Sequence, residues 1–96
     1  MAELRTRTVA LPAIVDLDAL DTVRDKLIEA VESGPVAVNG KAVERVSTNA
    51  LIMLISAAET ARRNNFAFEV ADASGPMLSA IGRLGFDECF TGLLKG

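Results

Sequence analysis

The sequence contains no histidine, tryptophan or tyrosine, and it has a single cysteine. Histidine is the commonest general base and the commonest transition-metal ligand, so its absence excludes a hydrolytic triad of the usual form. Cys89 alone can neither close an intramolecular disulfide nor assemble a zinc site. The chain also lacks both glycine-rich phosphate loops that mark nucleotide-binding enzymes. These absences predict a protein that is not an enzyme and that uses no cofactor and no metal.

Long apolar runs and long basic runs are also absent. The longest strongly apolar stretch, residues 50–58, is about half of a membrane span, so we expect no membrane insertion. The 13 acidic and 10 basic residues give a net charge of −3, which disfavours nucleic acid as a partner. Without a signal segment at its start, the chain is expected in the cytoplasm. Residues 1–96, half of them apolar, are expected to form one domain.

Acidic residues gather before and within the first predicted helix, at Asp16, Asp18, Asp21 and Asp25. A small catalyst that uses carboxylates alone is therefore the enzymatic alternative. Carboxylates at the start of a surface helix are, however, usually solvated partners of the helix dipole, and we prefer that interpretation. Cys89, beside Phe90, is expected to be a small packed hydrophobe.

Strand-like and helix-like patterns alternate along the chain. Strands are expected over residues 6–15, where Pro12 interrupts, and over 36–38 and 66–71. Helices are expected from Asp18, which can cap the first turn, to Ser33-Gly34-Pro35, then from Ser47 or Thr48 to Asn64, and from a Ser74 cap through Leu84. The sequence does not decide between helix and strand for the tail. The alternation predicts an α/β layer fold with a largely parallel sheet.

The elements are expected to share one core. Its predicted members are Val23, Leu27, Val36, Val38, Leu51, Leu54, Ile55, Phe68, Val70, Leu78 and Ile81.

The second predicted helix carries apolar residues on two sides. At about 100° per residue, one stripe is expected to face the sheet: Leu51, Leu54, Ile55, Ala58 and Arg62. The opposite side carries Asn49, Ile52, Met53, Ser56 and Thr60. An apolar patch beside small polar groups favours a docking face for another protein. The alternative is that Ile52 and Met53 pack under the first or third helix.

Residues 43–51, Val-Glu-Arg-Val-Ser-Thr-Asn-Ala-Leu, resemble the signature of STAS domains (sulfate transporter and anti-sigma factor antagonist). Asp16-Leu17-Asp18, Val36–Asn39 and Ala71–Ser74 are similar to the family's turn before the first helix, its central strand and its loop before the third helix. The resemblance extends from Val9 to Phe90. Together with the alternation of elements, it implies a single STAS-like domain: a four- or five-stranded mixed sheet with three to four helices mainly on one face.

The signature also departs from the family pattern. Ser47 replaces the usual aspartate, and Asn49 stands where anti-sigma factor antagonists carry the phosphorylated serine. The N-terminal strand pair is shortened to one strand. Because Asn49 cannot accept phosphate, Thr48 and Ser47 are the candidate phosphorylation sites, and we expect the protein to be mostly unmodified.

The resemblance implies a protein-interaction module of a bacterial regulatory pathway, either anti-sigma factor antagonist-like or chemotaxis-associated. The alternative is the STAS-type non-catalytic subunit of an ABC lipid-asymmetry transporter, in which a threonine at the position of Thr48 lies at the contact with the ATPase. The expected partner is a kinase-like protein, a receptor-associated protein or an ATPase subunit. It would bind through Ser47, Thr48, Asn49, Ile52, Met53 and Ser56. The oligomeric state is left open.

Overall fold

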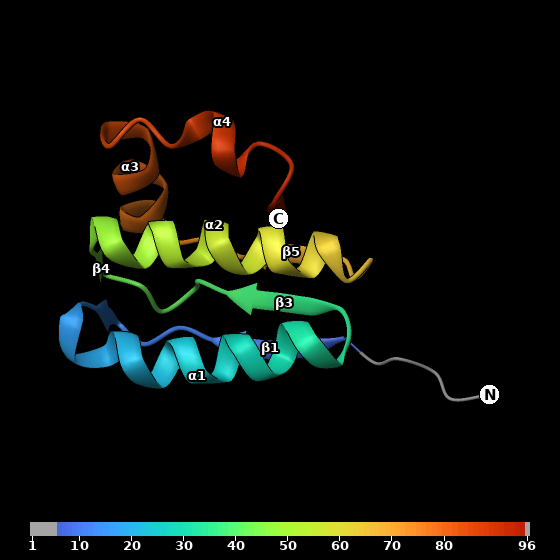
Figure 1. Cartoon of the computed structure of the whole chain (residues 1–96). Helices are drawn as coiled ribbons and strands as arrows, with labels where there is room; N and C mark the ends of the chain where they lie inside the picture. Colours follow the sequence, from blue (N-terminus) through green and yellow to red (C-terminus); the bar gives the residue numbers. More distant parts are fainter. Residues whose placement is uncertain (1–5, 96) are drawn as a thin grey trace.

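The computed structural model describes residues 6–95, apart from the side chains of Leu17, Asp18 and Lys95. Figure 1 shows the arrangement of the elements. In chain order they are β1 (Arg7–Ala10), β2 (Ile14–Val15), α1 (Leu17–Ser33), β3 (Val36–Asn39), β4 (Arg45–Val46), α2 (Thr48–Arg63), β5 (Phe68–Ala71), α3 (Gly75–Arg83), α4 (Asp87–Phe90) and β6 (Leu94–Lys95).

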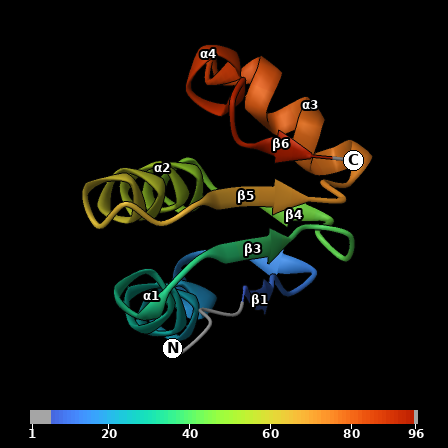
Figure 2. The ribbon, with the colours of Figure 1, turned by 90° about the vertical axis from the view of Figure 1, so that its right-hand side faces the viewer.

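The strands form a four-stranded sheet of order β1-β3-β5-β6 and a two-stranded sheet of β2 and β4. Val9, Val38 and Val70 are aligned across the larger sheet. Helices α1 and α2 lie side by side on one face of this sheet, and α3 and α4 lie near β6 (Figures 1 and 2). Every pairing within residues 6–95 is parallel, because a helix separates each pair of partners along the chain. The predicted α/β fold is confirmed, although all pairings among the described residues are parallel where a mixed sheet was expected.

Pro12 divides the predicted N-terminal strand into two. Strand β1 belongs to the larger sheet, whereas β2 pairs with β4. Proline has no N–H to donate, so it suits the connection between the two strands. Before Pro12, the last backbone hydrogen bond to the larger sheet is donated by the Leu11 N–H to the Asn39 carbonyl, at 2.9 Å. The expectation of one continuous strand was therefore wrong.

The helix ends follow the predicted signals closely. Helix α1 begins at Leu17, so Asp18 lies inside its first turn, and the predicted cap by the Asp18 side chain lies outside the described residues. Ser47 caps α2: its Oγ accepts from the Ala50 N–H at 3.1 Å. Ser74 caps α3 in the same way, accepting from the Met77 N–H at 3.2 Å. After α3 the chain turns at Gly85, whose positive φ of 79° suits glycine.

The core contains most of the predicted residues. Val23, Leu27, Val36, Val38, Leu51, Leu54, Val70 and Ile81 are buried, while Ile55 and Phe68 are half-buried against them. Leu78 was wrongly assigned to the core and is 45% exposed. On α3 the buried positions are Met77, Ala80 and Ile81, and Leu78 lies about 100° around the helix from Met77. Phe90 of α4 is also fully buried, although it is not among the core residues predicted above.

Candidate interaction site

Helix α2 presents a different stripe to the core from the predicted one. Its buried residues are Ala50, Leu51, Leu54, Ala57 and Ala61. Ile55 and Ala58 are half-buried, and Arg62 is exposed. Compared with the prediction, α2 is rotated about its axis so that its alanines face the core. These small side chains allow the helix to approach its neighbours closely. The predicted stripe was partly wrong for this reason.

A groove between α1 and α2 is the main concavity in which the predicted docking residues meet. We call it the α1–α2 groove. It encloses about 530 Å³ and is lined by Arg24, Leu27, Ile28, Val31 and Glu32 of α1 and by Asn49, Ile52, Met53, Ser56, Ala57 and Thr60 of α2. Leu27, Val31 and Ala57 are buried within it. Ile28 and Ile52, one from each helix, are 49% and 46% exposed.

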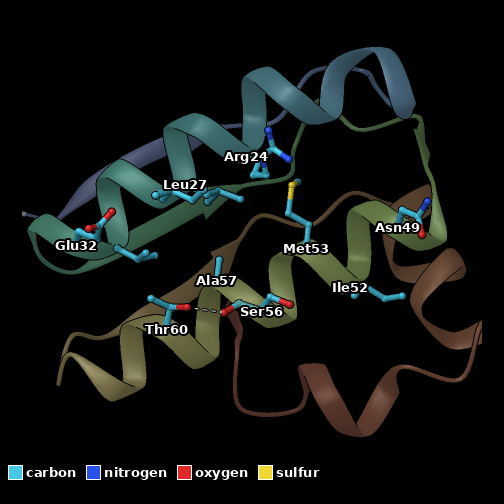
Figure 3. A pocket seen from close by; sticks show the side chains of 11 residues that line it. Arg24, Leu27, Glu32, Asn49, Ile52, Met53, Ser56, Ala57 and Thr60 are labelled. Carbon is cyan, nitrogen blue, oxygen red and sulfur yellow. Dashed lines mark hydrogen bonds between the residues drawn. The ribbon is translucent and has the colours of Figure 1, made fainter.

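Figure 3 shows how the side chains lie in the α1–α2 groove. Met53 extends from α2 toward α1 near Arg24, and it is half-buried against the core. Ile52 projects away from α1, toward solvent. The sequence left open whether these two residues pack or face outward. In the structure the two residues differ: Met53 packs against the core, and Ile52 is exposed.

Four of the six predicted partner-binding residues line this groove: Asn49, Ile52, Met53 and Ser56. The other two, Ser47 and Thr48, line a different hollow of about 390 Å³, together with Val46, Ala80, Arg83 and Leu84. Thr48 is exposed there, whereas Ser47 is half-buried and its hydroxyl caps α2. Successive helical residues lie about 100° apart, so Thr48 and Asn49 point to different sides. The predicted single face is thus divided into two.

The contribution of α1 to the groove was not predicted. Leu27 was predicted only as a core residue, and the sequence alone does not say that α2 lies beside it. The nearest signal was Ile28, an isoleucine next to the inward-facing Leu27. In the structure Ile28 lines the α1–α2 groove and is about half exposed.

Charge around the groove comes mainly from α1. Arg24 lies 3.6 Å from an oxygen of Asp21 and 4.0 Å from one of Asp25, and all three side chains are more than half exposed. Glu32 lies at the opposite end of the α1 lining. At the far end, the Asn64 side-chain amide donates to the Val31 carbonyl at 3.1 Å and ties the ends of α2 and α1 together. The groove is thus apolar along its length, with a cation and an anion separated along α1.

The other side of α2 carries an ion pair between Glu59 and Arg62. The hydrogen bond from Arg62 lowers the pKa of the Glu59 carboxyl below its ordinary value of 4.5. Both residues line a third hollow of about 320 Å³ that also includes Cys89 and Phe68. Cys89 is exposed, so its prediction as a packed hydrophobe was wrong; the neighbouring Phe90 is buried instead.

Within residues 6–95, no cluster of three or more acidic or cysteine side chains could hold a metal ion. None of the helices in that range combines the length and the apolarity needed to cross a membrane.

No protein-family model and no curated protein matches this chain. Among solved structures, its fold is similar to that of a sulfate transporter family protein from Wolinella succinogenes, with a TM-score of 0.69. The two chains are 14% identical, and the alignment covers 98% of this chain and 79% of the other. At this identity the likeness is one of fold alone. It supports the STAS-like α/β architecture that the sequence predicted.

Proposed function

We propose that this chain is a non-enzymatic protein-interaction module of a bacterial regulatory pathway in the cytoplasm, anti-sigma factor antagonist-like or chemotaxis-associated. Its partner docks in the α1–α2 groove. The observation that carries the proposal is that Asn49, Ile52, Met53 and Ser56, predicted as a docking face, line one apolar groove with Ile28. We expect a kinase-like or receptor-associated partner.

The shape of the groove favours a helical segment as the docked element. Helices α1 and α2 both run against the direction of the parallel strands, so they are parallel to each other (Figure 1). A third helix can lie between two such neighbours and contact both with one apolar face. Ile28 and Ile52 would then be covered from opposite sides, and the side-chain amide of Asn49 would offer hydrogen bonds at one end. Covering two half-exposed isoleucines is favourable because apolar surface leaves water.

A second candidate function is that of a non-catalytic transporter subunit that contacts an ATPase. The similar solved structure is described as a sulfate transporter family protein, so a transporter-associated role is kept as the alternative, although a likeness at 14% identity concerns the fold alone. Here the contact would involve Thr48, and Thr48 lies in the hollow with Arg83 and Leu84 rather than in the α1–α2 groove. The two functions therefore predict different contact surfaces, which substitutions can separate.

The test is to isolate the tagged protein from its native cell, identify the copurifying partner by mass spectrometry and measure binding of the purified pair. Ile52→Asp should weaken binding at least about tenfold, because a carboxylate would lose its hydration inside the complex. Leu78→Asp is the matched control, since Leu78 is 45% exposed on α3, outside the groove. Thr48→Arg should weaken binding only if the ATPase alternative holds. Equal binding by wild type and Ile52→Asp would refute docking in the groove.

A further inference from the structure

The outer edge of β1 is open among the described residues, where β1 pairs only with β3. The Arg7 N–H bonds to the Pro35 carbonyl and the Leu11 N–H to the Asn39 carbonyl, each at 2.9 Å. Backbone groups of successive strand residues point to opposite edges, so the N–H and C=O groups of Thr8 and Ala10 point away from β3. Both residues are exposed. A row of unpaired backbone N–H and C=O groups along a strand edge can pair with another strand.

A hollow runs alongside this edge. It encloses about 420 Å³ and is lined by the four residues of β1 and by Lys26, Glu29 and Ala30 of α1. Charged side chains on an edge strand commonly discourage pairing. Here, however, the Arg7 guanidinium lies 3.4 Å from a carboxylate oxygen of Glu29, so its charge is directed to α1 rather than along the edge. Helix α1 therefore borders the β1 edge without preventing another strand from pairing with it.

We propose that the β1 edge pairs with β1 of a second copy of this chain, antiparallel, so that the two larger sheets become one continuous sheet across a two-fold axis. In a two-fold interface, each residue i that contacts residue j of the other copy is matched by j contacting i. Lys26 and Glu29 meet this condition, since they carry opposite charges about one helical turn apart beside the same edge. An axis passing between them places Lys26 of each copy against Glu29 of the other.

The strand supports the same symmetry. With Val9 at the axis, Thr8 of one copy lies opposite Ala10 of the other, and the outward N–H and C=O groups of both residues are paired. Arg7 then lies opposite Leu11, so no two arginines meet. Pairing ends before Pro12, which has no N–H to offer.

This surface is separate from the α1–α2 groove, although both use α1. Lys26, Glu29 and Ala30 border the β1 edge, whereas Arg24, Ile28 and Val31 line the groove. A dimer of this kind leaves both grooves open. Failure of partner docking and failure of dimerisation are consequently distinguishable.

The experiment is sedimentation velocity over a concentration series, combined with amide hydrogen exchange. A short strand edge and one helix contact make a small interface, so we expect a weak dimer with a dissociation constant in the micromolar range. The amides of Thr8 and Ala10 should exchange quickly at low concentration and slowly at high concentration. A chain that stays monomeric up to about 1 mM, far above the range expected for such an interface, would refute the proposal. So would protection of these amides only after a different protein is added.

Variants that reverse the charges of Lys26 and Glu29 test the predicted contact between the two copies. Lys26→Glu places acidic groups against Glu29 of the other copy and should weaken dimerisation about tenfold or more. The double variant Lys26→Glu/Glu29→Lys restores opposite charges across the axis and should bind more tightly than Lys26→Glu, with only part of the affinity recovered because Arg7 loses its contact with Glu29. Ala10→Pro removes one outward N–H and should also weaken the dimer, with circular dichroism checking that it folds. A dimer unaffected by both Lys26→Glu and Ala10→Pro would use another surface, and the proposal would be wrong.

Discussion

The sulfur of Met77 occupies the space where Gly40 would carry a side chain: a Cβ built on Gly40 would lie 2.7 Å from the Met77 Sδ. The same Cβ would lie 3.3 Å from the Ala73 Cα. Hydrogen bonds join these two loops as well, because the Ser74 N–H donates to the Gly40 carbonyl at 3.1 Å and the Ser74 hydroxyl donates to the Val43 carbonyl at 2.5 Å. The loop after β3 thus packs directly on the loop before α3.

Gly40→Ala is therefore expected to destabilise the protein by about 1–3 kcal/mol, because the added methyl would meet both the sulfur of the fully buried Met77 and the backbone of Ala73. Chemical denaturation followed by circular dichroism measures the loss. Gly75→Ala is the matched control, since a Cβ on Gly75 would meet no atom within 4 Å. Equal unfolding free energies for the two variants would show that the two loops move apart to admit the methyl group without loss of stability.

Leu54→Ala should cost about 2–5 kcal/mol of unfolding free energy, because Leu54 is only 1% exposed and its truncation leaves a cavity. Ile55→Ala, at the half-buried neighbouring position, should cost less. Urea denaturation of both variants gives the comparison. A loss below about 1 kcal/mol for Leu54→Ala would mean that its surroundings collapse into the space, contrary to the close packing of the core.

Met53→Asp and Ile52→Asp should behave differently although the residues are adjacent. Met53 is half-buried against the core, so a carboxylate there should lower the free energy of unfolding by about 1–3 kcal/mol and also weaken partner binding. Ile52 is more exposed, so Ile52→Asp should weaken binding while the melting temperature stays within a few degrees of wild type. Thermal denaturation and partner capture, measured on the same preparations, test both statements. A Met53→Asp protein as stable as wild type would contradict the packing of Met53 against α1.

The Glu59 carboxyl should titrate below its ordinary value of 4.5, because the Arg62 guanidinium donates hydrogen bonds to it, one of them at 3.2 Å. A group with a depressed folded-state pKa contributes stability above its unfolded pKa, and this contribution is lost as the pH falls through the folded-state pKa. The loss therefore begins near pH 4.5 and continues below it. Carbon-detected NMR titration of the Glu59 carboxyl measures the pKa, and Arg62→Ala should raise it. An unchanged titration in Arg62→Ala would exclude this hydrogen bond as the cause.

Local signals predicted the element ends well, because capping depends on a few neighbouring atoms. Ser47 and Ser74 cap their helices in the structure as their sequence context predicted. The rotation of α2 and the exposure of Leu78 were not predictable in the same way. They depend on which neighbours each helix meets, and apolar residues next to each other on α3, such as Met77 and Leu78, fit either rotation.

The candidate site was predictable on α2 and not on α1. Asn49, Ile52, Met53 and Ser56 were found from their helical spacing alone. The division between this groove and the hollow of Thr48 required the positions of α1 and α3. A single helix face can be read from its sequence, but the partner elements that border it are set by the tertiary fold.

The parallel pairing of the strands has a consequence for how the chain folds. Arg7 pairs with Val36, and Val36 pairs in turn with Phe68, so each neighbour is reached only after a helix has been traversed. No hairpin is available as an early local unit in the described chain, and pairings between distant segments form slowly because the intervening loop loses entropy first. Helices α1 and α2 can form on the microsecond scale. The rate of refolding is therefore expected to be limited by the step in which β3 pairs with both β1 and β5. The circular dichroism signal of the helices should appear before the sheet has formed.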